Sequence, residues 1–157
     1  MDTELTLAKQ ALRALRERGL TVAVAEGTTG GRLGERFTRY PGASAVFKGA
    51  VATYDYPSRT GVLGIPAALL RAHGSVSEPV VRAMAEAVRE RFGTALGLAS
   101  SGVAGPGGKN VGRCWLALAG PDGVRTRLIE EPEASRIALQ RTFTAHALAL
   151  LVEALTR

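Results

Sequence analysis

The chain has 157 residues, a formal net charge of +6 at pH 7, and a composition of 46% hydrophobic and 22% charged residues. These values are typical of a soluble globular protein and predict a single domain over residues 1–157. No apolar run reaches the roughly 20 residues that cross a bilayer, which excludes a membrane-spanning segment. Cys114 is the only cysteine, so an internal disulfide is excluded. Because no signal peptide is recognisable, the expected location is the reducing cytoplasm.

The isoelectric point of about 10.2 raises the question of nucleic-acid binding. Lysine occurs only at Lys9, Lys48 and Lys109, and the other basic residues are arginines spread along the whole chain. The sequence contains no basic cluster or tail, and few aromatic residues accompany the arginines. Nucleic acid and membranes are therefore not expected as partners.

The N-terminal quarter predicts two helices around a short strand. The first helix ends near Gly19 and has apolar residues at helical spacing, namely Leu5, Ala8, Leu12 and Leu15. Residues 21–25 are a short β-rich run that enters a glycine-rich loop at residues 26–31. A second helix follows this loop and ends before Pro41.

The middle of the chain predicts one strand and two helices. Residues 46–54 are strand-like, and Pro57 breaks this strand. Pro66 is expected in the first turn of a helix that runs to about Ala72. Ser77 is expected to cap the next helix, which has a proline in its first turn.

The C-terminal half predicts three strands and a long helix. Residues 96–101 form a strand that enters a second glycine-rich loop at residues 102–108. Residues 114–119 and 124–129 predict an antiparallel hairpin, because the Gly-Pro-Asp-Gly between them suits a tight turn. Residues 133–155 predict a final helix with acidic residues in its first turn. Helices that alternate with strands, together with the hairpin, predict an α/β fold, a three-layer α/β/α sandwich with a mixed sheet.

Both glycine-rich loops leave the carboxyl end of a predicted strand, which is where ligands bind in open α/β sheets. The loop at residues 26–31 precedes a helix, so its N–H groups and the helix N-terminus could hold a phosphate. A tight strand–helix turn explains that loop equally well. In the other loop, Ser100 and Ser101 precede four glycines within residues 102–108, which favours a pocket wall that touches a ligand. Neither loop has the P-loop or dinucleotide-binding spacing.

Seven segments give these loops a specific context. They are Ala25-Glu26-x-x-Thr29-Gly30-Gly31, Pro41-Gly42-Ala43-Ser44-Ala45-Val46-Phe47-x-Gly49, Ala52-x-Tyr54, Leu63-Gly64, His73-Gly74-x-Val76-Ser77, Ala83-Met84-Ala85 and Ser101-Gly102-Val103-Ala104-Gly105-Pro106-Gly107-Gly108. In this order and spacing the chain resembles the CinA C-terminal domain family from end to end. The resemblance implies an α/β/α domain that hydrolyses the amide of nicotinamide mononucleotide to nicotinic acid mononucleotide and ammonia, with no metal and no cofactor.

The chain departs from this family at the residues that would do the chemistry. The family's first loop reads Ala-Glu-Ser-Cys-Thr-Gly-Gly, and its serine is the expected nucleophile. Gly27 stands at the serine position and Thr28 at the cysteine position. Arg59 stands where the family has the lysine expected to activate the serine. Glycine has no attacking atom and arginine stays protonated, so both halves of a Ser–Lys pair are missing.

Other positions bear on whether a ligand still binds. The resemblance implies a ligand pocket built from Glu26, Thr29, Gly30, Gly31, Tyr54, Ser101, Gly102 and Gly105. The family's Gly-Asp-Arg before the last helix is replaced by Glu130-Glu131-Pro132-Glu133, whose charges would oppose a phosphate. Thr28 and Ser101 carry hydroxyls that could substitute for the lost nucleophile, but no base in register activates either.

Three functions remain open on these residues. The first is a catalytically impaired or inactive homologue of the amidohydrolases, which retains a pocket for a mononucleotide or phosphate. The second is an active nicotinamide mononucleotide amidohydrolase with a relocated nucleophile. The third is a non-enzymatic binding protein associated with competence or DNA damage. The apolar stripes exceed what one sheet can cover, so a homo-oligomer is also expected.

Overall fold

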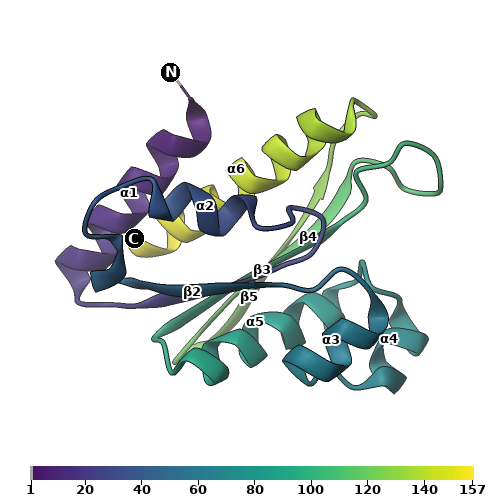
Figure 1. The fold of residues 1–157 in the computed structure, drawn as a ribbon, viewed down its shortest axis with the longest axis horizontal. Coiled ribbons are helices and arrows are strands. Elements are labelled where there is room, and N and C mark those ends of the chain that lie inside the picture. The colour runs from purple at the N-terminus through teal and green to yellow at the C-terminus, as the bar shows by residue number, and fades with distance from the viewer. Residues whose placement is uncertain (1) are drawn as a thin grey trace.

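A computed structural model describes residues 2–157, and one five-stranded sheet organises the chain (Figure 1). The strand order is β2-β1-β3-β4-β5. The strands are β1 (Val22–Glu26), β2 (Phe47–Ala52), β3 (Leu96–Gly102), β4 (Arg113–Gly120) and β5 (Gly123–Glu130). Strands β2, β1 and β3 are parallel, whereas β4 runs antiparallel to both β3 and β5. The predicted mixed sheet and its C-terminal hairpin are confirmed.

Helices cover both faces of the sheet, which confirms the α/β fold (Figure 1). One face carries α1 (Thr3–Arg18), α2 (Arg32–Thr38) and α6 (Arg136–Leu155), and a 3-10 turn (Ala43–Ala45) precedes β2. The other face carries α3 (Tyr56–Leu63), α4 (Ala67–His73) and α5 (Glu78–Phe92). Of the helices in the described part of the chain, none is both long and apolar enough to cross a membrane.

The two faces of the sheet differ in side-chain size, because successive strand residues point to opposite sides. Large residues such as Leu98 and Leu116 pack under α1 and α6. The face under α5 instead presents alanines, namely Ala23, Ala25, Ala99, Ala117 and Ala119. A Cβ at Gly97 would lie 2.2 Å from the Ala85 carbonyl oxygen of α5. Small residues therefore let α5 pack directly against the strand backbones.

Three sequence-based expectations differ from the structure near element ends. Helix α3 was not predicted, because Pro57 reads as a strand breaker but lies at the first turn of a helix capped by Asp55. Helix α6 begins at Arg136 rather than at residue 133, since the Ser135 hydroxyl accepts the Ala138 N–H, and its first turn has no acidic residue. Ser77 precedes α5 as expected, but its hydroxyl donates to the Gly74 carbonyl instead of capping the helix.

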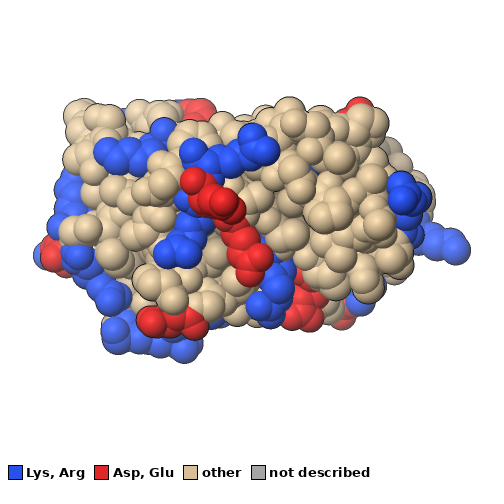
Figure 2. Space-filling model, turned by 90° about the horizontal axis from the view of Figure 1, so that it is seen from below, with Lys and Arg blue, Asp and Glu red and all other residues tan. Residues whose placement is uncertain are grey.

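Charge is unevenly distributed over the face formed by α3, α4 and α5 (Figure 2). Basic and acidic side chains alternate over one part of this face, so no continuous basic stripe crosses it. The part over α3 and α4 carries few charges and includes the exposed Tyr56 and Val62. This distribution does not resemble the single-sign surface that follows a nucleic-acid backbone.

The only cysteine provides a test of the core. Cys114 lies on β4 with no exposed surface, and burial raises the pKa of its thiol to about 12. Because only the thiolate reacts, we expect no labelling by a thiol reagent at pH 8 in the native protein and complete labelling in guanidinium chloride. Mass spectrometry measures both. Fast native labelling would show that β4 is not enclosed as described.

Candidate functional site

A cavity of about 330 Å³ opens at the edge of the sheet where β1 and β3 end. Five segments meet there: the loop after β1, the start of α3 with the residue before its cap, the loop between α4 and α5, the end of β3 with the loop after it, and the first turn of α6. The lining residues are Gly27, Thr28, Tyr54, Arg59, Ser75, Gly102, Val103, Ala104, Gly105, Pro106, Gly107 and Arg136. Both glycine-rich loops predicted from the sequence therefore contribute to one cavity.

The Glu26 carboxylate holds the first loop against α2. Glu26 is fully buried and accepts the N–H groups of Leu33 and Gly34 at 2.8 and 3.1 Å. These amides belong to the first turn of α2, which lacks a side-chain cap of its own. The Thr29 hydroxyl also donates to Glu26, at 2.7 Å, and contacts the Ser100 hydroxyl at 3.2 Å. Glu26 thus supplies the negative charge that a helix N-terminus favours.

This arrangement changes the role of four residues expected to bind a ligand. Glu26 and Thr29 are buried and bonded to each other, and neither lines the cavity. Gly30 and Gly31 form the left-handed turn into α2 and also do not line the cavity. A phosphate is not needed at this turn, because the α2 amides already have an anionic partner.

Gly27, the residue after Glu26, lies beside the guanidinium of Arg59. A Cβ placed on Gly27 would lie 2.7 Å from Arg59 Nη2 and 3.1 Å from the Ser100 carbonyl oxygen. The first distance is too short for any side chain unless the guanidinium moves. The two positions where the sequence departs from the family pattern are therefore spatial neighbours, and the absence of a side chain at Gly27 makes room for the arginine.

Arg59 is a buried cation with few partners. Only 5% of its surface is exposed, and it projects from the first half of α3, whose start is fixed by a capping box between Asp55 and Ser58. Its Nη1 donates to the Ser75 carbonyl oxygen at 2.8 Å, whereas its buried Nε has no hydrogen-bond partner among the described residues. Desolvation lowers the pKa of Arg59, and Tyr56 partly opposes that shift.

The hydroxyls near Gly27 differ in their availability. Ser101 is fully buried and donates to the Ser75 carbonyl oxygen at 2.6 Å, so its hydroxyl is occupied and does not line the cavity. Thr28 does line the cavity, and Gln140 of α6 holds its carbonyl oxygen at 2.9 Å. Of the two substitutes for the nucleophile considered from the sequence, only Thr28 reaches the cavity.

Arg136 is a cavity residue that the sequence reasoning missed. It is the first residue of α6, and its guanidinium donates to the Gly105 carbonyl and to the Tyr54 hydroxyl. Tyr54 and Gly105 both line the cavity, as does Gly102. The signal that could have found Arg136 is Ser135, because a serine cap places the following residue in the first helical turn.

The acidic run before α6 does not line the cavity. Glu130 pairs with Arg113 at 3.4 Å, and the Glu131 carboxylate lies 2.9 Å from the ring of His146. Glu133 is exposed in the segment that leads to Ser135. None of these three carboxylates lines the cavity, so the sequence-based expectation that they would repel a phosphate bound there is not supported.

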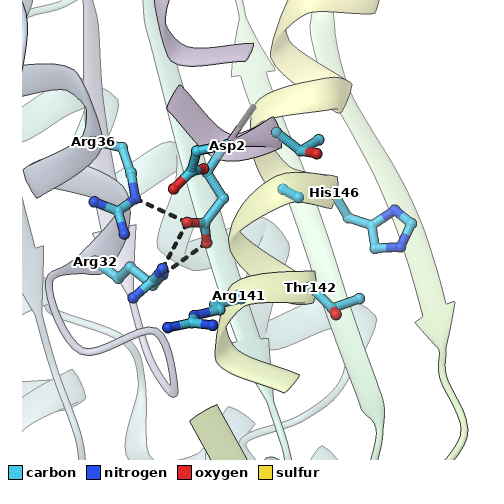
Figure 3. A pocket seen from close by; sticks show the side chains of 9 residues that line it. Asp2, Arg32, Arg36, Arg141, Thr142 and His146 are labelled. Atoms are coloured by element: carbon cyan, nitrogen blue, oxygen red, sulfur yellow. Dashed lines mark hydrogen bonds and ion pairs between the residues drawn. The ribbon is translucent and has the colours of Figure 1, made fainter. Parts of the chain in front are cut away.

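A second cavity, of about 570 Å³, lies between α1, α2 and α6 (Figure 3). Arg32 and Arg36 point toward the buried Glu4 carboxylate, with three N–O distances of 2.7, 2.7 and 2.9 Å. Arg36 also pairs with Glu35. Because these arginines already have carboxylate partners, this cavity is a weaker candidate for an anion site despite its greater volume. Within residues 2–157, no three His, Cys, Asp or Glu side chains gather as a metal site would require.

Comparisons with known proteins identify the family of this chain. Residues 4–155 match the model of the CinA C-terminal domain. The chain belongs to this family. It is 57% identical over 122 residues to a CinA-like protein of Synechococcus sp. strain CC9902, covering 75% of this chain and 29% of that protein. It is 45% identical over 155 residues to a CinA-like protein of Gloeobacter violaceus, covering 94% of this chain and 36% of that protein.

Solved structures of family members share the whole fold. The competence/damage inducible protein CihA from Agrobacterium tumefaciens superposes with a TM-score of 0.94 at 28% identity, covering 100% of this chain and 98% of that one. A CinA superfamily protein from Klebsiella pneumoniae 700603 gives 0.93 at 28% identity, covering 99% and 98%. The present chain thus spans about a third of the length of the two curated relatives, yet nearly all of these two solved chains.

The contact between Gly27 and Arg59 predicts energetic coupling. We expect Gly27→Ser alone to destabilise the fold by about 1–3 kcal/mol, because the added side chain meets the guanidinium. Arg59→Lys should relieve this clash, so that the double variant is more stable than the sum of the single changes by about 1 kcal/mol or more. Urea unfolding of all four proteins gives the coupling. Gly61→Ser is the control, because a Cβ at Gly61 meets no atom within 4 Å; strictly additive effects would contradict the contact.

The bonds of Glu26 predict a structural role that is separate from binding. Glu26→Gln replaces one acceptor oxygen with an NH₂ group that faces backbone donors of α2. We expect a loss of about 1.5–3 kcal/mol in the free energy of unfolding, the range for hydrogen bonds to a charged group. The exposed Glu86 on α5 offers a matched control, because Glu86→Gln should change stability by less than about 0.5 kcal/mol. Equal effects of the two substitutions would rule out this role.

Proposed function

We propose that this protein binds an anionic mononucleotide at the cavity between the two glycine-rich loops and does not hydrolyse it by the family's serine–lysine route. The observation that carries the proposal is the contact of Gly27 with Arg59. Gly27 has no nucleophilic atom at the position of the family's serine. Arg59 places a permanently charged group at the position of the family's lysine.

The chemistry of the cavity lining supports the loss of hydrolysis. Among the lining residues, Thr28 and Ser75 carry the aliphatic hydroxyls, and no lysine, histidine, aspartate or glutamate lines the cavity. A hydroxyl is a weak nucleophile until an adjacent base removes its proton. The Tyr54 hydroxyl accepts a hydrogen bond from the cation Arg136, an arrangement that does not make it a base for Thr28.

The electrostatics of the lining support the binding of an anion. Arg59 and Arg136 contribute two positive charges, and no carboxylate of the lining balances them. Arg136 also stands at the start of α6, a helix of 20 residues whose N-terminus favours negative charge. We place the phosphate of a mononucleotide beside Arg136 and its neighbour Tyr54, which is 64% exposed.

An active enzyme with a relocated nucleophile is the alternative, and Thr28 is the residue that favours it. Thr28 lines the cavity, and its hydroxyl makes no hydrogen bond within the described part of the chain. Such an enzyme would need a base brought by the ligand itself, since the lining offers none. The two functions are therefore separated by a measurement of turnover.

We expect no release of ammonia or nicotinic acid mononucleotide above background when the protein is incubated with millimolar nicotinamide mononucleotide at pH 7–8. Chromatography of the products measures turnover, and calorimetry on the same sample measures binding. Arg136→Met should weaken binding at least tenfold, whereas Arg71→Met, an exposed arginine on α4 outside the cavity, should not. Steady turnover that Thr28→Ala abolishes would overturn the proposal and favour the relocated nucleophile.

A further inference from the structure

We infer that the inner end of the cavity binds a carboxylate on the Arg59 guanidinium, so that the ligand class is an acid carrying a second anionic group for Arg136. This inference rests on the proposed function and adds to it the chemistry of the end that does not carry the phosphate. The relevant observations are the missing partners of Arg59, the contrast with another buried arginine, and the different exposure of the two ends.

The guanidinium of Arg59 has donors that the protein leaves unused. Its Nη1 donates to the Ser75 carbonyl oxygen, and its buried Nε donates to nothing among the described residues. Its Nη2 lies beside Gly27 and makes no hydrogen bond to residues 2–157. A carbonyl oxygen is a neutral acceptor, so the charge itself also lacks a partner. Burying an unpaired charge is costly, and an incoming anion removes that cost.

Arg36 is a second buried arginine, and its partners differ from those of Arg59. Arg36 is 7% exposed, close to the 5% of Arg59. Its Nε donates to Glu4 at 2.9 Å, and its Nη1 pairs with Glu35. Arg59 forms no ion pair with any described carboxylate, although its burial is equal or greater. The missing carboxylate at Arg59 is therefore the group that we expect the ligand to bring.

A carboxylate suits this end better than a carboxamide or a phosphate. Its two oxygens match the planar fork of a guanidinium, whereas the NH₂ of a carboxamide would face N–H donors. One buried cation balances one negative charge, but a phosphate carries about −1.5 to −2 at neutral pH and would leave charge unpaired. Phosphate instead fits the opposite end, where Arg136, the α6 N-terminus and solvent are available.

Arg136 can receive the second anion because its present partners are neutral. Its guanidinium contacts the Gly105 carbonyl and the Tyr54 hydroxyl, and neither cancels its charge. Arg136 is partly exposed, whereas Arg59 lies in the buried part of the lining. The cavity lining thus combines one buried cation, Arg59, with one partly exposed cation, Arg136, and a ligand that contacts both would carry two anionic groups.

The test compares two mononucleotides that differ in one group. Calorimetry on the wild-type protein titrates nicotinic acid mononucleotide, which carries a carboxylate, and nicotinamide mononucleotide, which carries a carboxamide. We expect the acid to bind at least tenfold more tightly, equivalent to about 1.4 kcal/mol. Arg59→Met should weaken the binding of the acid more than that of the amide and so remove this preference. Arg136→Met should weaken both ligands, and Arg71→Met should weaken neither.

The outcomes separate this inference from the proposed function. Equal affinities of the wild-type protein for acid and amide would overturn the carboxylate assignment and leave anion binding in place. Binding of neither mononucleotide would overturn both. Competition of inorganic phosphate with the acid in the Arg136→Met protein would assign phosphate to Arg59 and overturn the carboxylate assignment. The comparison on the wild-type chain does not depend on any variant folding.

Discussion

The buried carboxylate of Glu26 is the interaction on which the functional edge of the sheet depends. It accepts the first amides of α2 and the Thr29 hydroxyl, and its own carbonyl oxygen accepts the Thr53 N–H at 3.0 Å. Through Thr29 it also connects to Ser100 at the end of β3. Through its carboxylate, its backbone carbonyl and Thr29, this one residue therefore connects the ends of three adjacent strands and the start of a helix. Because Gly27 directly follows Glu26 in the chain, these bonds also hold Gly27 in place.

The same interaction provides an anionic partner for the α2 amides that follow the first glycine-rich loop. A helix N-terminus favours negative charge, but here the chain provides that charge from β1. The unsatisfied positive charge lies one residue further, where Arg59 approaches Gly27. A Cβ at Gly27 would lie 2.7 Å from Arg59 Nη2, so a side chain at Gly27 requires the guanidinium to move. The two positions are thus linked by packing.

The carbonyl oxygen of Ser75 shows how the surrounding loops support that unit. It accepts both Arg59 Nη1 at 2.8 Å and the Ser101 hydroxyl at 2.6 Å. The loop between α4 and α5 is therefore attached to the end of β3 through a group that also accepts a hydrogen bond from the cation. This shared acceptor leaves Ser101 without a free hydroxyl and keeps Arg59 directed at the cavity. Ser101, which the sequence offers as a substitute nucleophile, therefore uses its hydroxyl to hold the loop between α4 and α5.

The sequence by itself determined the α/β class, the hairpin and the two loops, because hydrophobic period and turn residues act over a few neighbouring positions. The resemblance to the CinA C-terminal domain family also singled out Gly27 and Arg59 as departures from that family's pattern. The sequence could not show that these two residues touch, that Glu26 faces α2, or that Arg136 reaches the cavity. Gly27 and Arg59 are 32 residues apart in the chain, and Arg136 bonds to Gly105 and Tyr54, which are 31 and 82 residues away from it. Only the packing of the sheet and helices brings such segments together, so only the tertiary structure decided which side chains meet.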